Sequence, residues 1–181
     1  MRNLRWTIPT LVLAALLAAG CILVSGQFIV SYELPTPLTI SQTAVVHMDV
    51  DLNTVGSYKD HKSDLKSLAD VAILGEFSNH GSAPVDVEVW MTPSVTSYAT
   101  ADLVVTDPTA VKVWGPLRLN VDETKKVGWD QSAALFLQGK AALVEQIKGD
   151  GVFTLYALGK TTPYSFVLGH GVLVAVVNAG K

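Results

Sequence analysis

Alternation of apolar and polar residues is the feature that most limits what this 181-residue chain can fold into. Every second residue is apolar from Phe28 to Leu34, from Val46 to Leu52 and from Val85 to Met91. A period of two is that of a β-strand with one face buried and the other facing solvent. These stretches therefore predict strands that lie on a common core.

Further strands are predicted where the chain is apolar on both faces or alternates around a break. The ranges are 71–77, 111–120, 152–158 and 166–177, with Gly115-Pro116 indicating a bulge or bend inside the second of them. Turn-forming residues at 79–84, 107–108 and 159–163 separate the strands. About seven to nine short strands with such turns predict an all-β fold, mainly an antiparallel β-sandwich.

Two segments have helical features. Residues 133–148 form the one longer predicted helix, although Gly139 disfavours a helix by about 1 kcal/mol relative to alanine. We therefore allow for a helix that begins only after this glycine. A second, shorter helical turn is predicted at Ser63–Leu68, with Ser63 as its N-cap.

The first residues have the three zones of a secretory signal peptide. Two arginines precede a continuously apolar run at 11–19, and small residues follow it up to Cys21. The segment Leu17-Ala18-Ala19-Gly20-Cys21 resembles the lipobox of bacterial lipoproteins, although Ala18 stands where leucine is most common. This resemblance implies cleavage before Cys21 and lipid attachment to that cysteine.

A retained transmembrane helix is the alternative. The apolar segment from Ile8 to Val24 would rise only about 25 Å as a helix, whereas a bilayer core needs about 30 Å. Pro9 and Gly20 weaken both of its ends. We therefore expect a signal peptide at 1–20 and a single β-sandwich domain at 21–181.

Net charge and cysteine count disfavour one kind of partner and exclude one kind of covalent bond. Loss of Arg2 and Arg5 with the signal peptide would lower the formal net charge from −3 to −5, which disfavours nucleic acid as a partner. The single cysteine cannot form an internal disulfide.

Because Ile22 rather than aspartate follows Cys21, analogy with lipoproteins of two-membraned bacteria favours the outer membrane.

The densest polar cluster lies between His47 and Asp64. Asp49, Asp51, Asn53 and Asp60 have part of the spacing of a calcium loop, but Thr54 replaces its glycine and the final glutamate is missing. We therefore expect no metal here and keep these four residues as weak calcium candidates. The segment Tyr58–Asp64 resembles one in uncharacterised exported β-sandwich proteins, and its alternating charges also fit a solvated loop.

Two tryptophans are candidate contacts for a ligand or a partner. Trp90 and Trp114 lie on the polar sides of their predicted strands, where an exposed indole could stack on a sugar or a protein surface. The alternative is that a helix or a second sheet covers these faces. His61 is a third candidate contact.

Motifs of common enzymes are missing from the sequence. It has no H-E-x-x-H zinc motif and no G-x-S-x-G nucleophile elbow, and nothing in it calls for a cofactor. We therefore expect a non-catalytic, lipid-anchored protein of the cell envelope that serves adhesion, scaffolding or partner binding. Two alternatives remain: a surface filament subunit that assembles by strand addition, and an enzyme or transport accessory with a site near Asp60, His61 and Asp64.

Overall fold

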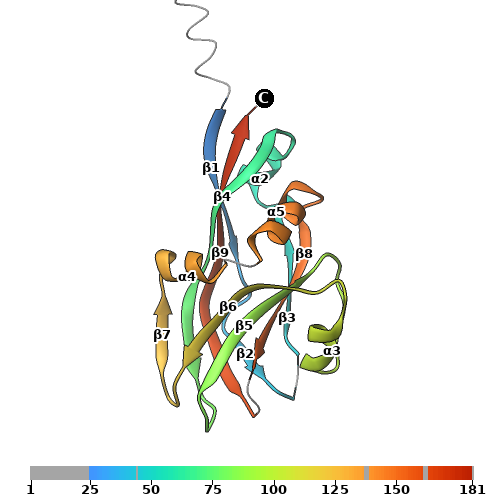
Figure 1. Ribbon diagram of the computed structural model, residues 1–181. Helices are drawn as coiled ribbons and strands as arrows, with labels where there is room; N and C mark the ends of the chain where they lie inside the picture. The colour runs from blue at the N-terminus through green and yellow to red at the C-terminus, as the bar shows by residue number, and fades with distance from the viewer. Residues whose placement is uncertain (1–24, 44, 137–138, 161–162, 181) are drawn as a thin grey trace, which may run out of the picture.

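A computed structural model describes residues 25–43, 45–136, 139–160 and 163–180 of the protein. Within these ranges nine strands form two antiparallel sheets that pack face to face, as Figure 1 shows. The predicted all-β sandwich is therefore confirmed. The signal peptide and Cys21 lie outside the described residues.

The larger sheet is built around one long strand. The order is β1 (Ser25–Glu33), β9 (Ser165–Gly180), β4 (Leu65–Asn79) and β7 (Thr124–Val127). The short strand β2 (Leu38–Ser41) also pairs with β9, next to residues 165–168, whereas β1 pairs with residues 172–180. β1 and β2 therefore follow one another along the same edge of β9.

The smaller sheet has the order β3 (His47–Asp51), β8 (Val152–Gly159), β5 (Val85–Thr92) and β6 (Val111–Leu119). Its inner face packs on the larger sheet through the alternating residues that the sequence predicted, Val85, Val87, Val89 and Met91 among them. Its outer face carries a second apolar cluster beneath the helix α3 (Ala101–Thr106).

The predicted helix at 133–148 is two helices. α4 (Trp129–Leu135) and α5 (Lys140–Lys148) are separate, and the second begins directly after Gly139, as the sequence allowed. A Cβ at Gly139 would lie 2.1 Å from Cα of Val113 and 2.6 Å from the carbonyl oxygen of Lys112. The glycine is therefore required by the close approach of the chain to β6, not by helix propensity.

The helical turn predicted at Ser63–Leu68 is wrong in its extent. A 3-10 turn, η2, covers only Lys62–Asp64, no side chain caps it, and strand β4 begins at Leu65. Pairing of Leu65 with Ala179 of β9 extends the strand to this point. Long-range strand pairing thus overrides the local helical preference.

The segment between β3 and η2 is not a solvated loop. A 3-10 turn, η1 (Leu52–Thr54), leads into the helix α2 (Gly56–His61). Tyr58 of this helix is fully buried and its hydroxyl donates a 2.7 Å hydrogen bond to the carbonyl oxygen of Ile147 in α5. This bond joins α2 to the helix that lies beside β8.

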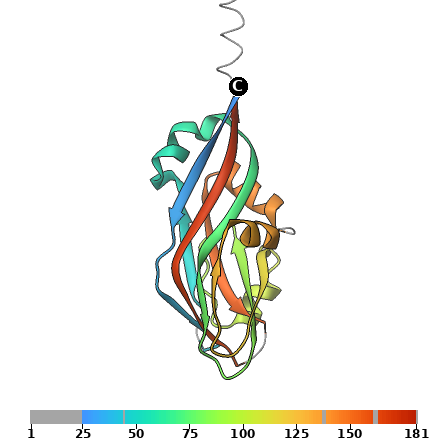
Figure 2. The same ribbon diagram turned by 90° about the vertical axis from the view of Figure 1, so that its left-hand side faces the viewer.

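One end of the molecule contains both the start of β1 and the end of β9. Ser25 pairs with Gly180 there, and the first residues of β4 join them (Figures 1 and 2). β2 and the start of β9 lie at the opposite end. Sixteen residues of β9 at about 3.3 Å each separate the two ends by about 50 Å.

The strand that follows the expected anchor belongs to its own sheet. All nine residues of β1 pair with β9, and the hydroxyl of Ser57 in α2 donates to the carbonyl oxygen of Ile29 on the outer edge of β1. Donor-strand assembly requires an N-terminal strand that leaves its own sheet. In this structure β1 instead stays paired within its own sheet.

Among the described residues, no helix has both the length and the apolar character needed to span a bilayer.

A buried serine holds α4 between the two sheets. The hydroxyl of Ser132 accepts hydrogen bonds from the backbone N–H of Ile73 in β4, at 2.7 Å, and from the indole N–H of Trp114 in β6, at 3.0 Å. All three groups are buried. One oxygen therefore satisfies a donor from each sheet.

Replacement Ser132→Ala should lower the free energy of unfolding by about 1–3 kcal/mol for each donor left without a partner. Urea unfolding followed by far-UV circular dichroism measures the change. Ser97→Ala is the control, because Ser97 is exposed, and its value should stay within about 0.5 kcal/mol of wild type. Equal stability of the two variants would contradict this role of Ser132.

Replacement Gly139→Ala should destabilise the protein by about 1–3 kcal/mol, although alanine is the better helix former, because its methyl group would collide with the β6 backbone. Gly56→Ala is the matched control at the start of α2, since no atom lies within 4 Å of the added methyl group. It should be neutral or slightly stabilising in the same unfolding assay. A Gly139→Ala protein as stable as Gly56→Ala would show that the approach to β6 has room to relax.

Candidate functional site

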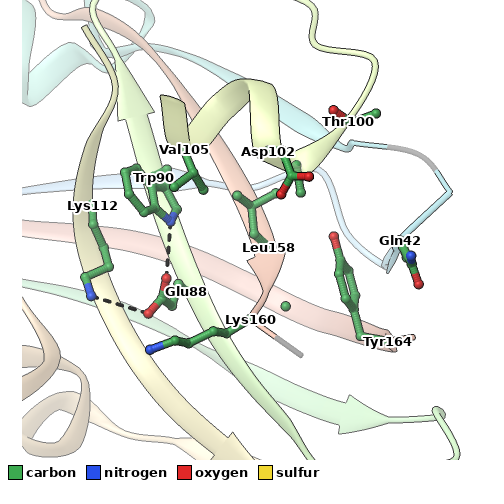
Figure 3. A pocket seen from close by; sticks show the side chains of 12 residues that line it. Gln42, Glu88, Trp90, Thr100, Asp102, Val105, Lys112, Leu158, Lys160 and Tyr164 are labelled. Carbon is green, nitrogen blue, oxygen red and sulfur yellow. Dashed lines mark hydrogen bonds and ion pairs between the residues drawn. The ribbon is translucent and has the colours of Figure 1, made fainter. Parts of the chain in front are cut away.

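A pocket of about 540 Å³ opens on the outer face of the smaller sheet, between that sheet and α3 (Figure 3). It is formed by segments that are distant in sequence. Its lining comprises Glu88 and Trp90 of β5, Lys112 of β6, Leu158 and Gly159 of β8 with Lys160 after it, Thr100, Ala101, Asp102 and Val105 of α3 and its cap, and Gln42 and Tyr164 from the segments beside β2 and β9. The volume is in the range of small-ligand sites.

A nearly buried carboxylate organises one wall of the pocket. Glu88 is 8% exposed, and its two oxygens contact the ammonium of Lys112 at 3.3 Å and the indole N–H of Trp90 at 3.4 Å. Such a carboxylate needs charged or hydrogen-bonding partners to offset the loss of water. Trp90 itself is half-buried, because it packs against the apolar cluster beneath α3, which includes Val104 and Leu158.

The opposite wall depends on the glycine at the end of β8. The ring of Tyr164 lies over Gly159, where a Cβ would come within 2.5 Å of the ring. Burial raises the pKa of the Tyr164 hydroxyl, a backbone hydrogen bond at Gly159 partly opposes this rise, and the charge of the Asp102 carboxylate adds to it. The hydroxyl therefore stays neutral at physiological pH and lies within the electrostatic reach of Asp102.

The helix α3 forms the roof of the pocket and is fastened at its C-terminal end. The hydroxyl of Tyr98 donates a 2.6 Å hydrogen bond to Asp107, whose other oxygen accepts from the backbone N–H and the hydroxyl of Thr109. The Tyr98 ring packs edge-on against Tyr156 of β8, with ring centroids 5.2 Å apart. These contacts join the segments on both sides of α3 to each other and to the smaller sheet.

Of the three predicted contact residues, only Trp90 lines this pocket. Trp114 is 0% exposed and stacks on Phe77 in the core, with ring centroids 5.4 Å apart, so its prediction as a surface contact is wrong. Two register shifts between β5 and β6 place Trp114 opposite Val89, which faces the core. The bulge expected at Gly115-Pro116 is present, and it is what reverses the face of this tryptophan.

His61 lies at the surface of α2, in a different element from the pocket. Its ring is tilted against that of Phe28, with centroids 4.8 Å apart. Asp60 is exposed on the same helix, and Asp64 of η2 accepts a long 3.4 Å hydrogen bond from its neighbour Ser63. These three residues do not line the pocket between α3 and the sheet, so the pocket gives no support to an enzyme site built on them.

The weak calcium candidates do not form a ligand set. Asp51 caps η1 and accepts from Asn53, whose own side-chain oxygen accepts from the ammonium of Lys62 at 2.9 Å. Asp49 accepts from the Thr154 hydroxyl on the neighbouring strand, and Asp60 is exposed on α2. Across the described ranges no group of three or more histidine, cysteine, aspartate or glutamate residues is arranged to hold a metal ion. An internal cation, Lys62, occupies the oxygen that calcium would need.

Sequence reasoning missed most of the pocket. Glu88 and Trp90 were visible only as the polar side of a strand, and Asp102, Lys160 and Tyr164 belong to segments whose contact depends on the tertiary fold. The one usable signal was Trp90 on a strand face with two acidic neighbours, Asp86 and Glu88.

No protein-family model matches the sequence, and no curated protein matches it. Among solved structures, dimeric latent PorU from Porphyromonas gingivalis shares 10% identity at a TM-score of 0.29, over 87% of this chain and 13% of that one. A chain in the structure of Desmodium yellow mottle tymovirus shares 10% identity at a TM-score of 0.27, over 87% of this chain and 83% of the virus chain. The chain thus spans a small part of PorU.

The fastening of α3 should depend on pH at both extremes. The pKa of Asp107 is lowered by hydrogen bonds from Thr109 and Tyr98, so its stabilising effect should be complete above the pKa of an unfolded aspartate and lost as the pH falls through the folded value. Burial and the bond to Asp107 raise the pKa of Tyr98 to about 12. Its effect should be complete below about pH 10 and lost as the pH rises through 12.

Replacement Asp107→Asn tests this pair. The ionisation midpoint of Tyr98, followed by NMR of its ring carbon, should move from about 12 towards lower pH, because the carboxylate that opposes the phenolate is gone. The acid-side loss of stability should also diminish. Asp130→Asn, an exposed change at the start of α4, should leave both measurements as in wild type. An unmoved Tyr98 midpoint would contradict the coupling.

Proposed function

We propose that this protein is a lipid-anchored, non-catalytic binding protein of the cell envelope, which carries a small-ligand pocket at the end of the domain remote from its anchor. Support for the anchor comes from the lipobox-like sequence that ends at Cys21. Support for binding comes from the pocket between α3 and the smaller sheet.

The observation that carries the proposal is the position of the pocket relative to Ser25. Four peptide units separate Cys21 from Ser25, a reach of at most about 14 Å, so lipid on Cys21 would keep the start of β1 close to a membrane surface. Gln42 and Tyr164 of the pocket flank the opposite end of β9, about 50 Å away. An anchored domain would therefore hold its pocket well clear of the lipid headgroups.

A binding role suits the chemistry of the pocket better than a catalytic one. The Glu88 carboxylate is already engaged by Lys112 and Trp90, and the floor between the charged residues is apolar Leu158. Engaged charges around an apolar floor fix the orientation of a ligand, which is the usual division of work in a binding site. As a lipoprotein with isoleucine after the cysteine, the protein would reside at the outer membrane of a two-membraned host.

The intact mass of the protein extracted from membranes of its host tests the anchor. The expected mass is that of residues 21–181 carrying a diacylglyceryl group, and Cys21→Ser should lose both the lipid and the membrane fraction, since a hydroxyl cannot form the thioether. Ser25→Ala, four residues further on, is the control and should keep the lipid. An unmodified full-length mass in the wild-type protein would overturn the proposal.

A further inference from the structure

The charges of the pocket are divided between its two ends. At one end the ammonium groups of Lys112 and Lys160 flank the single carboxylate of Glu88, which leaves a net charge of about +1 there. In Figure 3 the side chain of Lys160 reaches along the pocket towards Glu88. Within the described part of the chain no side chain forms an ion pair or hydrogen bond with the Lys160 ammonium, so it is available to a ligand.

Oxygen atoms gather at the other end. Asp102 contributes a carboxylate, and its neighbours in the lining are the hydroxyls of Thr100 and Tyr164 and the side-chain amide of Gln42. The side chain of Thr100 makes no capping bond to α3, and the residue is exposed. An arrangement of one carboxylate and several neutral oxygens suits an ammonium group, which offers three donors and no acceptor.

Apolar surface separates these two ends. Leu158 lies between Asp102 and Lys160 in Figure 3, and Val105 borders the same region from α3 with 49% of its surface exposed. Trp90 closes the side of the pocket, with its indole N–H already committed to Glu88. A ligand that spans the pocket must therefore present apolar surface at its middle.

We infer that the pocket binds a small zwitterion of the peptide class, a short apolar peptide whose two termini are free. Its ammonium group would lie at Asp102, its carboxylate at Lys160, and its apolar side chains on Leu158 and Val105. A ligand with only one charge would leave one end of the pocket unmatched, and complementary charge at both ends provides specificity. This inference rests on the proposed binding function and names the class of ligand.

Calorimetric titration of the membrane-extracted protein in detergent micelles tests the inference with matched peptides. L-leucyl-L-leucine carries both charges, its N-acetyl derivative lacks the ammonium group, and its C-terminal amide lacks the carboxylate. We expect the unmodified dipeptide to bind about two- to fivefold more tightly than either blocked form, since an ion pair at a partly exposed site contributes up to about a factor of five. O-phosphoethanolamine, a zwitterion of lipid headgroups without apolar side chains, should bind more weakly than the dipeptide.

Charge-removing variants assign each end of the ligand. Asp102→Asn should abolish the preference for the dipeptide over its N-acetyl form and keep the preference over the amide, and Lys160→Gln should do the reverse. Asp60→Asn and Lys59→Gln, exposed changes on α2, are the controls and should alter neither preference. A merely structural effect of the pocket variants would weaken all three peptides equally.

The outcomes separate the ligand class from the binding function. Equal binding of free and blocked peptides, removed by the pocket-filling variant Thr100→Trp, would overturn the zwitterion and leave a pocket that binds apolar ligands. Tighter binding of O-phosphoethanolamine than of the dipeptide would reassign the site to lipid headgroups and overturn the peptide class. No saturable binding of any probe would overturn the inference, while the mass of the membrane-extracted protein decides the anchor independently.

Discussion

The rest of the structure depends on the pairing of β9 with three other strands. Its sixteen residues join β1 and β2 along one edge and β4 along the other, so the N-terminal, central and C-terminal parts of the chain meet on one strand. Because side chains on a strand alternate between faces, a shift of one residue in β9 would move the buried residues of all its neighbours to the wrong face. The register of β9 therefore fixes the core, and its length fixes the distance between the two ends of the molecule.

Closure of the sandwich at one side relies on one buried hydroxyl and one glycine. The hydroxyl of Ser132 satisfies a backbone donor of β4 and the indole of Trp114 together, and Gly139 allows the start of α5 to approach the backbone of β6 directly. The first requirement is an acceptor for two buried donors, and the second is room for a close approach. Helix propensity alone would have favoured alanine at each position.

The outer face of the smaller sheet shows how a fold converts a strand pattern into a pocket. The alternation of β5 correctly predicted that Val85, Val87, Val89 and Met91 face the core. The same pattern left Glu88 and Trp90 on a face that the sequence assigned to solvent or to a covering element, and α3 is that element. Since α3 is only six residues long, it covers part of this face and leaves the remainder as the pocket.

The sequence by itself determined the fold class, most of the strands and the inward faces of β1, β3 and β5, because these follow from local periodicity. It could not place Trp114, whose face depends on two register shifts against β5, nor the short strands β2 and β7, which are defined by their partners. Only the tertiary structure decided that Lys62 occupies the oxygen that a calcium ion would need, and that Asp102, Glu88 and Lys160 border one pocket. Contacts between segments so distant along the chain are set by strand pairing and packing, which leave no local pattern in the sequence.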